Sequence, residues 1–222
     1  MKGLIFTAKS NYARFRRPYT TTSALSYTLI HPIAVKGLIG SMLGIDYDNL
    51  YNYTNDLKIG IQVLNELHKD TQSFNLIANA NNNKNKNFQS SIEFLRDVNY
   101  RIFVSGDDNK VEALYKVIIS KRFTFTPYLG NSENIASINL EGIYDVRNTS
   151  NDICHTVIPI NKVNYNDSSD LHIYIDRIPI NNNDSREYIS YEKVIFTINN
   201  NKLKLSDNYN VYSVGDYNVY FF

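Results

Sequence analysis

Three arginines stand within four positions near the amino terminus of this 222-residue chain: Arg14, Arg16 and Arg17, in the stretch "ARFRRPYTTTSALSY". A guanidinium group can bind two phosphate oxygens with parallel hydrogen bonds. The hydroxyl groups that follow can bond to a sugar-phosphate backbone, and Tyr19 or Tyr27 offers a ring on which a base can stack. This chemistry predicts a nucleic-acid-binding loop, with a plain solvated surface loop as the alternative.

The stretch "HPIAVKGLIGSMLG" directly after this loop predicts a helix over residues 31–44. Pro32 suits the first helical turn, and apolar residues recur at the spacing of a buried helical stripe. Three glycines, Gly37, Gly40 and Gly44, share a neighbouring stripe. Each glycine inside a helix costs about 1 kcal/mol relative to alanine, so this bare flank requires an explanation.

The glycine flank has two explanations. Either the protein's own backbone packs there and needs a small residue, or an RNA backbone approaches the helix more closely than side chains would permit. The free N–H groups and positive dipole at a helix start suit an anion. We therefore predict RNA along Gly37 and Gly40, with Lys36 and the arginines beside it. In a third interpretation the chain is a protein-only scaffold whose glycine helix packs on a partner's helix.

Residues suited to enzymatic chemistry are sparse. The four histidines lack metal-ligand spacing, so we expect neither a metal nor a cofactor. Cys154 stands in an apolar stretch, where a buried and unreactive thiol is expected. A metal-independent ribonuclease needs a general base beside a 2′-hydroxyl, and His31, at the junction of loop and helix, is the histidine nearest the predicted phosphate path. A capping or packing role for His31 is the alternative.

The charge and composition bound the class of protein. Lys and Arg number 23 against 22 Asp and Glu, a net charge of +1 that does not by itself indicate a nucleic-acid partner. However, residues 1–40 contain six basic side chains and no acidic one, which makes this segment locally positive. The single cysteine fits a reducing compartment. Since no apolar run is long enough to span a membrane and the start does not read as a secretory signal, we expect a cytoplasmic protein with no membrane partner.

The pattern along the chain is strand, helix, strands, helix, and then strands alone. Before the second helix, strands are expected at 2–9, 58–65, 72–79, 90–97 and 99–106, with 58–65 and 72–79 as a pair. The second helix is expected at 107–120, capped by Asp107 or Asp108. The polar stretch 78–89 lacks apolar periodicity and predicts the mobile tip of a long hairpin.

This order predicts an α+β fold of the split βαβ, or ferredoxin-like, type. We assign residues 1–140 to that domain, including a protruding β-hairpin at about 65–100. Residues 141–222 form a strand-rich extension, an added antiparallel sheet that packs as one unit with the first part.

Two motifs resemble those of a known family, the CRISPR-associated Cas5 proteins of the RAMP superfamily. "GLIFTAKSNYARFRRPYTTTSALSYTLIHPIAVKGLIGSMLGI" resembles the family's opening, with an A-x-F-R-x-P-like stretch at 13–18 and a G-L-x-G-x-x-L-G helix at 37–44. "PYLGNSE" at 127–133 resembles the family's P-Y-L-G-x-S-E segment, and the resemblance covers roughly residues 1–140.

The resemblance implies an RRM-like fold with a hairpin thumb, and a non-catalytic subunit of Cascade, the type I CRISPR effector complex of antiviral defence. Such a subunit holds the 5′ handle of the CRISPR RNA. By position, the handle would follow Gly37, Gly40 and the preceding arginines, and Tyr128 and Gly130 would line the same groove. The overall style of the sequence favours the type I-B branch.

The resemblance also implies protein partners. The thumb, through Lys84, Lys86 and Phe88, would contact the terminal copy of the repeated backbone subunit. Other surfaces would meet the large subunit and, through the assembled complex, target DNA. One branch of the family cuts precursor CRISPR RNA with a tyrosine, a lysine and a histidine. We find no lysine–histidine pair in the region after the thumb where that branch carries it, so a metal-independent endoribonuclease is the alternative and not the preferred function.

Overall fold

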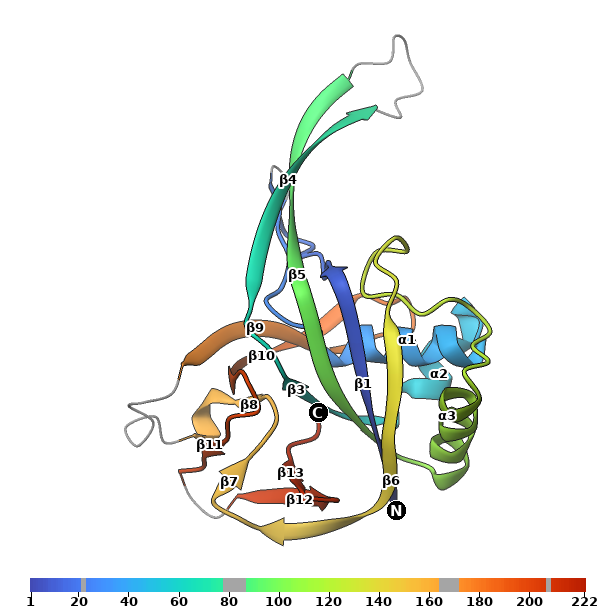
Figure 1. Ribbon diagram of the computed structural model, residues 1–222, viewed down its shortest axis with the longest axis vertical. Helices are drawn as coiled ribbons and strands as arrows, with labels where there is room; N and C mark the ends of the chain where they lie inside the picture. Colours follow the sequence, from blue (N-terminus) through green and yellow to red (C-terminus); the bar gives the residue numbers. More distant parts are fainter. Residues whose placement is uncertain (21–22, 78–86, 164–171, 207–208) are drawn as a thin grey trace.

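A central, mainly antiparallel sheet carries helices on one of its faces in the computed structural model, which describes residues 1–20, 23–77, 87–163, 172–206 and 209–222 (Figure 1). The strands that form the middle of the sheet lie in the order β6-β1-β5-β3. Their bounds are β1 Lys2–Ala13, β3 Lys58–Val63, β5 Asn87–Ser105 and β6 Ser137–Ser150. Helix α1 (Pro32–Leu43) follows β1, and α3 (Asp108–Ser120) follows β5. This is the strand and helix order of the predicted βαββαβ unit.

Both predicted helices begin at the residues that the sequence indicates. The imidazole Nδ1 of His31 accepts from the backbone N–H of Ala34 at 3.2 Å and caps α1. Asp107 caps α3 by accepting from the N–H of Asn109 at 3.0 Å and of Lys110 at 3.3 Å. At the other end of α1, Gly44 adopts φ +73°, the left-handed conformation in which glycine commonly terminates a helix.

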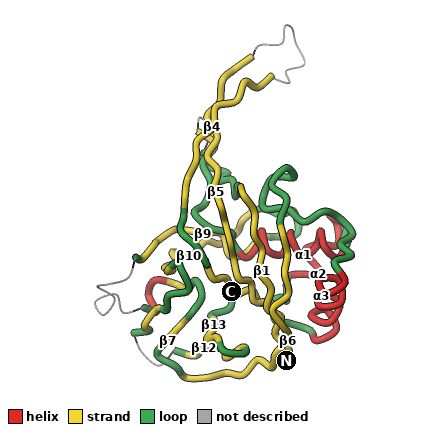
Figure 2. The backbone as a smooth tube through the Cα atoms, in the orientation of Figure 1, coloured by secondary structure: helices red, strands yellow, loops and turns green. Residues whose placement is uncertain are grey.

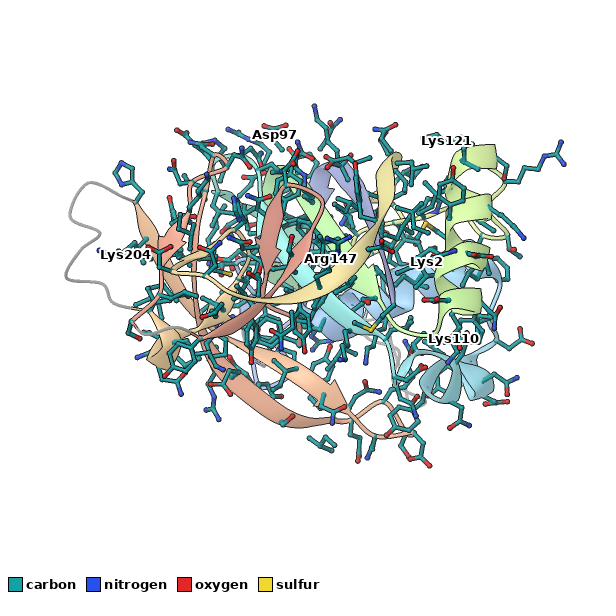
Figure 3. The ribbon with its side chains drawn as sticks, turned by 90° about the horizontal axis from the view of Figure 1, so that it is seen from below. Lys2, Asp97, Lys110, Lys121, Arg147 and Lys204 are labelled. Atoms are coloured by element: carbon teal, nitrogen blue, oxygen red, sulfur yellow. The ribbon has the colours of Figure 1, made fainter. Side chains whose placement is uncertain are left out.

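A short helix that the sequence analysis did not predict, α2 (Tyr47–Thr54), packs beside α1. It is tied to α3 by Lys110, whose ammonium group donates to the carboxylate of Asp56 at 2.7 Å and to the carbonyl of Tyr53 at 2.7 Å. Figure 3 shows Lys110 at the end of α3 that faces α2. Lys2 of β1 similarly pairs with Glu112 of α3.

The two faces of the sheet have different coverings. Leu4 and Phe6 of β1 point into the main core, which α1 and α3 close with apolar side chains. Ile5 points to the opposite face, where it packs with Phe103 and with residues near the carboxyl terminus. Those residues come from β12 (Asn210–Val214), β13 (Tyr217–Val219) and the segment after it. The alternation along β1 is that of a strand buried on both sides.

A hairpin of β4 (His68–Ile77) and the first half of β5 projects from the body as the predicted thumb (Figures 1 and 2). Two details of the prediction are wrong. Strands β3 and β4 do not pair with each other, because each pairs with a different stretch of β5. The segments 90–97 and 99–106 are one continuous strand, in which Asp97 adopts φ +54°. The Asn65 side chain spans this irregularity, accepting from the N–H of Asn99 at 3.0 Å and donating to the carbonyl of Asp97.

The predicted partner-binding residues of the thumb fall largely outside this description. Lys84 and Lys86, with most of the predicted mobile tip, lie outside the described residues. The backbone of Phe88 pairs with that of Leu76 at the end of the described hairpin.

The carboxy-terminal part consists mainly of strands, and it packs against the first part. Strands β9 (Ile173–Asn182), β10 (Tyr188–Thr197) and β8 (Ile158–Pro159) form a separate antiparallel sheet. Two shorter strands, β7 (Ile153–Cys154) and β11 (Leu203–Lys204), pair with each other. The predicted boundary at residue 140 lies inside β6, and Phe222 exchanges two backbone hydrogen bonds with Ile59 at 3.0 and 3.1 Å. Cys154 is buried, and burial raises the pKa of its thiol. No helix within the described part of the chain is long and apolar enough to cross a membrane.

Candidate nucleic-acid interface

The described residues of the basic loop, 14–20 and 23–27, are joined by backbone hydrogen bonds between the two arms of the loop. Strand β1 continues to Ala13, so the loop begins later than the sequence suggests. The N–H of Arg17 donates to the carbonyl of Leu25 at 2.9 Å, and the N–H of Tyr27 donates to that of Phe15 at 2.8 Å. Beyond these bonds, β2 (Ser23–Ala24) pairs in parallel with β5 at the base of the thumb. The arginines are therefore held at fixed positions.

Arg17 is committed to the fold. One of its terminal nitrogens donates to both carboxylate oxygens of Asp176, in β9, at 2.8 and 3.0 Å, and its Nε donates to the carbonyl of Ser26 at 3.1 Å. Asp176 also accepts from the N–H and hydroxyl of Thr28 at 2.9 and 2.6 Å. Burial has the largest single effect and lowers the pKa of Arg17, but the charge of Asp176 and the interactions with Tyr19 together outweigh it, so that the pKa is raised. The guanidinium group anchors the loop to the second sheet, and its charge is already matched.

Arg14 and Arg16 have no such partner. Within the described ranges, neither has a carboxylate at ion-pair distance, and the Nε of Arg14 is buried without a hydrogen-bond partner. Burial, and next the positive charge of Arg16, lower the pKa of Arg14, although Glu133 acts in the opposite direction. Two adjacent cations, one of them partly desolvated, form a site that an anion would stabilise.

These two arginines border a hollow of about 340 Å³, which we name the first hollow. Its lining residues come from α1, the basic loop, the segment around Tyr128, α2 and the β9–β10 hairpin. The residues predicted for RNA binding that line it are Arg14, Arg16, Gly37, Tyr128 and Gly130. Residues of the two motifs therefore line one hollow, and RNA binding there stays a prediction.

The second motif packs directly against the first. The N–H of Arg14 donates to the carbonyl of Leu129 at 3.2 Å, and Leu129 is buried. Gly130 adopts φ +89°, and a Cβ atom there would lie 1.7 Å from the carbonyl oxygen of Arg14. Glycine at this position is thus required by the contact between the two segments. The contact places Tyr128, which is 40% exposed, at the rim of the first hollow.

The three helix glycines have different surroundings. A Cβ on Gly40 would lie 2.3 Å from the Cδ1 atom of Leu50, in α2, and a Cβ on Gly44 would lie 2.6 Å from Thr124. The prediction that RNA approaches Gly40 is wrong, because the protein's own side chain occupies that space. Gly37 differs: nothing lies within 4 Å of an added Cβ, and the residue lines the first hollow. Close approach by a ligand stays a prediction for Gly37 alone.

Two further predicted contacts fail for clear reasons. The Tyr27 ring is fully buried, with the Arg17 guanidinium 5.1 Å from its centre, so it cannot stack on a base. Tyr19, the other candidate, is 60% exposed at the end of the loop. Lys36 does not line the first hollow, because its ammonium group reaches the carbonyl of Asn55 at 3.3 Å. Burial lowers the pKa of Lys36, while Asp56 raises it.

His31 is among the lining residues of the first hollow, but it is a capping and packing residue. Its side chain is buried between the rings of Phe15, Tyr27 and Tyr188, and burial lowers its pKa to about 3. Because Nδ1 accepts the capping bond from Ala34, the neutral ring carries its proton on Nε2, which lies 3.5 Å from the Tyr188 hydroxyl. Both ring nitrogens are engaged with the protein, which does not suit a general base.

Sequence reasoning missed the contribution of the β9–β10 turn. Arg186 and Tyr188 line the first hollow, and the Arg186 guanidinium lies 4.7 Å from the ring centre of Tyr47, in α2. In the sequence both stand in an Asn- and Asp-rich turn more than 140 residues after the helix. Their single occurrences carry no spacing signal, so folding alone brings them to the site.

A family model matches most of this chain. The model described as "CRISPR-associated protein (Cas_Cas5)" matches residues 3–187, which include every lining residue of the first hollow except Tyr188. The chain belongs to the Cas5 family. The search of curated proteins found no match.

Solved structures with the Cas5-like fold of this chain are similar over almost its full length. A CRISPR protein from Archaeoglobus fulgidus matches with a TM-score of 0.61 and 10% identity, covering 99% of this chain and 98% of its own. A chain of a CRISPR RNA-guided surveillance complex matches with a TM-score of 0.57 and 9% identity, covering 92% and 91%. A chain of the type III-B Cmr-beta complex with cognate target RNA and AMPPnP gives a TM-score of 0.50 and 12% identity, covering 92% and 86%. At these identities the similarity is one of fold.

Proposed function

We propose that this Cas5 protein is a non-catalytic, RNA-binding subunit of a type I Cascade complex, and that it holds the 5′ handle of the CRISPR RNA in the first hollow. The observation that carries the proposal is the meeting of Arg14 and Arg16, uncompensated by carboxylates among the described residues, with the bare surface of Gly37. Guanidinium groups beside exposed backbone suit phosphate groups. The ferredoxin-like, RRM-like order of strands and helices is a frame in which RNA binding is common.

Each part of the first hollow has a role in this proposal. Arg14 and Arg16 neutralise backbone phosphates, and the handle passes over Gly37 without a side chain in its way. Tyr128, at the rim, offers an exposed ring to a base. Arg17 keeps the loop in place through Asp176, so the cavity exists before RNA arrives and little ordering entropy opposes binding.

The thumb supplies the proposed contact with the repeated backbone subunit. Phe74, Leu76, Ile92 and the buried Phe94 share one face of the hairpin by strand register with the polar Asp70, Gln72 and Ser90, and Phe74 is 37% exposed. A two-stranded hairpin is marginal on its own, so a partner that covers the exposed apolar side chains of this face would stabilise it. Lys84, Lys86 and Phe88 remain predicted contacts at the tip. Contacts with the large subunit, and through the complex with target DNA, belong to the same proposal, as does the type I-B assignment.

The non-catalytic assignment rests on the surroundings of His31. A general base must accept a proton from the 2′-hydroxyl, whereas His31 already uses Nδ1 as an acceptor and is buried. Incubating the purified chain with repeat RNA in EDTA tests this assignment. We expect binding without cleavage; specific cleavage under these conditions would overturn it in favour of a metal-independent endoribonuclease.

The decisive experiment is to recover the tagged full-length chain from its native cells and to sequence the RNA that accompanies it. The proposal predicts many different guides that share one 5′ end. Recovery of protein partners without RNA would contradict it and would favour a protein-only scaffold. RNA of unrelated sequence, with no shared end, would also contradict handle recognition.

A further inference from the structure

A second hollow adjoins the first. It is lined by Arg16, Pro18, Arg186, Glu187, Tyr188 and Tyr191. Three of these residues, Arg16, Arg186 and Tyr188, also line the first hollow. The concave surface is therefore continuous from α1, across the basic loop, to the β9–β10 hairpin of the carboxy-terminal sheet. An extended ligand in the first hollow would reach the second across these three shared residues.

Arg186 stands at the junction in an unusual backbone conformation. The turn is closed by bonds from the N–H of Arg186 to the carbonyl of Asn183 at 3.0 Å and from the N–H of Asn183 to the carbonyl of Glu187 at 3.1 Å. Arg186 has φ +64°, in the left-handed region that glycine favours in such turns. Strained backbone of this kind persists where the surrounding structure holds it, and it clusters at ligand-binding positions. Here the residue in this conformation is an arginine that lines both hollows.

The charge of Arg186 is uncompensated within the described part of the chain. Its guanidinium group lies over the Tyr47 ring and has no carboxylate at ion-pair distance. Glu187 also lines the second hollow, where its carboxylate accepts from the side-chain amide of Asn183 at 3.0 Å and keeps its negative charge. Arg16, from the basic loop, contributes a second guanidinium group, so the lining has two cations and one anion. Together these two cations make the junction attractive to a phosphate.

Aromatic rings complete the second hollow. The ring centres of Tyr188 and Tyr191 lie 6.2 Å apart in an edge-to-face arrangement, and the Arg177 guanidinium lies 5.4 Å from the centre of the Tyr191 ring. Rings beside arginines are the ordinary means by which proteins bind single-stranded RNA, since every base has a face to stack.

We propose that the second hollow binds a nucleotide of the same RNA strand that occupies the first, with its phosphate between Arg16 and Arg186 and its base against Tyr188 or Tyr191. The carboxy-terminal hairpin is then part of the RNA-binding surface. This inference rests on the proposed function, because it needs RNA in the first hollow.

The test uses the full chain and a handle RNA shortened by one nucleotide at a time from each end. In the unchanged protein, loss of the nucleotide that occupies the second hollow should weaken binding roughly 5- to 150-fold, the range of a stacked base. The Arg186→Gly variant should bind the full RNA more weakly, and it should lose less affinity than the unchanged protein when that nucleotide is removed, because its phosphate contact is already weakened. For this variant, the slope of log K against log salt should be lower by about 0.7, the contribution of one phosphate contact on a single strand.

Two controls separate binding from folding. Glycine suits the backbone at residue 186, so Arg186→Gly should resist urea at least as well as the unchanged protein. Arg147→Ala removes an arginine that lies on β6, outside both hollows, and should leave RNA binding unchanged (Figure 3).

The outcomes distinguish this inference from the proposed function. If Arg14→Gln with Arg16→Gln weakens binding while Arg186→Gly does not, the second hollow lies off the RNA path and the proposed function stands. Equal effects of RNA shortening on the unchanged protein and on Arg186→Gly would likewise overturn the inference. If none of these substitutions alters binding, both proposals fail.

Discussion

Replacing Gly37 by alanine separates the two reasons for which a helix can retain glycine. Gly37 lies inside α1, and an added Cβ would meet nothing within 4 Å. Alanine is favoured over glycine inside a helix by about 1 kcal/mol. The free protein should therefore gain about 1 kcal/mol of unfolding free energy, equivalent to roughly 2–4 °C in melting temperature for a chain of this size.

The same methyl group should weaken RNA binding. If a ribose-phosphate backbone rests on the bare surface of Gly37, the methyl group intrudes on a packed contact, and overpacking typically costs about 1–3 kcal/mol. That cost corresponds to a roughly 5- to 150-fold loss of affinity. Urea denaturation of the free chain and fluorescence anisotropy with labelled handle RNA measure the two effects separately.

Gly40→Ala is the comparison within the same helix, because its methyl group would press on the Leu50 side chain, which also lines the first hollow, and would not itself meet the RNA. It should lose part or all of the stability gained in Gly37→Ala and weaken RNA binding less than Gly37→Ala does. A Gly37→Ala protein that is more stable and binds RNA as before would refute the close approach of RNA to α1.

Three further predictions concern the residues around the groove. Asp176→Ala should lower the unfolding free energy, measured in urea, by about 2–3 kcal/mol. This is less than the usual 3–5 kcal/mol for removing one partner of a buried ion pair, because the Arg17 side chain is 22% exposed. As a control, Asp145→Ala removes one partner of an ion pair in which both side chains are more than 70% exposed, and it should cost under about 0.5 kcal/mol. His31 has a folded-state pKa of about 3, so its contribution is present above the unfolded value of about 6.5 and is lost as pH falls toward 3. His31→Asn keeps a capping side chain but has no group that titrates in this window. In urea denaturation at each pH, the unfolding free energy of this variant should therefore fall less steeply with decreasing pH than that of the unchanged protein, by up to about 1.4 kcal/mol per pH unit. Parallel plots of unfolding free energy against pH would contradict the assignment. Tyr19→Ser should weaken RNA binding by about 1–3 kcal/mol. Tyr27→Phe should leave RNA binding unchanged. The Tyr27→Phe variant should also be as stable as the unchanged protein, because the buried Tyr27 hydroxyl lacks a hydrogen-bond partner among the described residues.

Local signals in the sequence were sufficient for the main helices. The cap at Asp107, the proline at position 32 and the apolar stripes are set by neighbours within a few residues, and α1 and α3 begin where predicted. Helix α2 gave no comparable signal, because most of its eight residues are polar or aromatic and Thr54 alone is buried. Strand β5 was divided in the prediction at polar residues near Asp97, where a side chain from residue 65 spans the irregularity. Such support cannot be read from the strand itself.

The sequence identified the site residues that belong to its two motifs. It could not show which of these side chains are occupied by contacts with residues distant in the sequence. Arg14, Arg16, Gly37, Tyr128 and Gly130 meet as the two motifs suggest. The role of Arg17 depends on Asp176, which lies 159 residues away in the sequence. The burial of Gly40 likewise depends on Leu50 of the unpredicted helix. Residue type fixed what these side chains can bind, and tertiary contacts fixed which of them are free to bind it.

The most direct measurement of the central claim is the salt dependence of handle RNA binding by the Arg14→Gln, Arg16→Gln double variant. Removing one cation that neutralises a phosphate of a single strand lowers the slope of log K against log salt by about 0.7. The account predicts a slope lower by about 1.4, for two such cations, and a weaker complex, with Arg147→Ala indistinguishable from the unchanged protein. An unchanged slope and affinity in the double variant would contradict a phosphate seat in the first hollow.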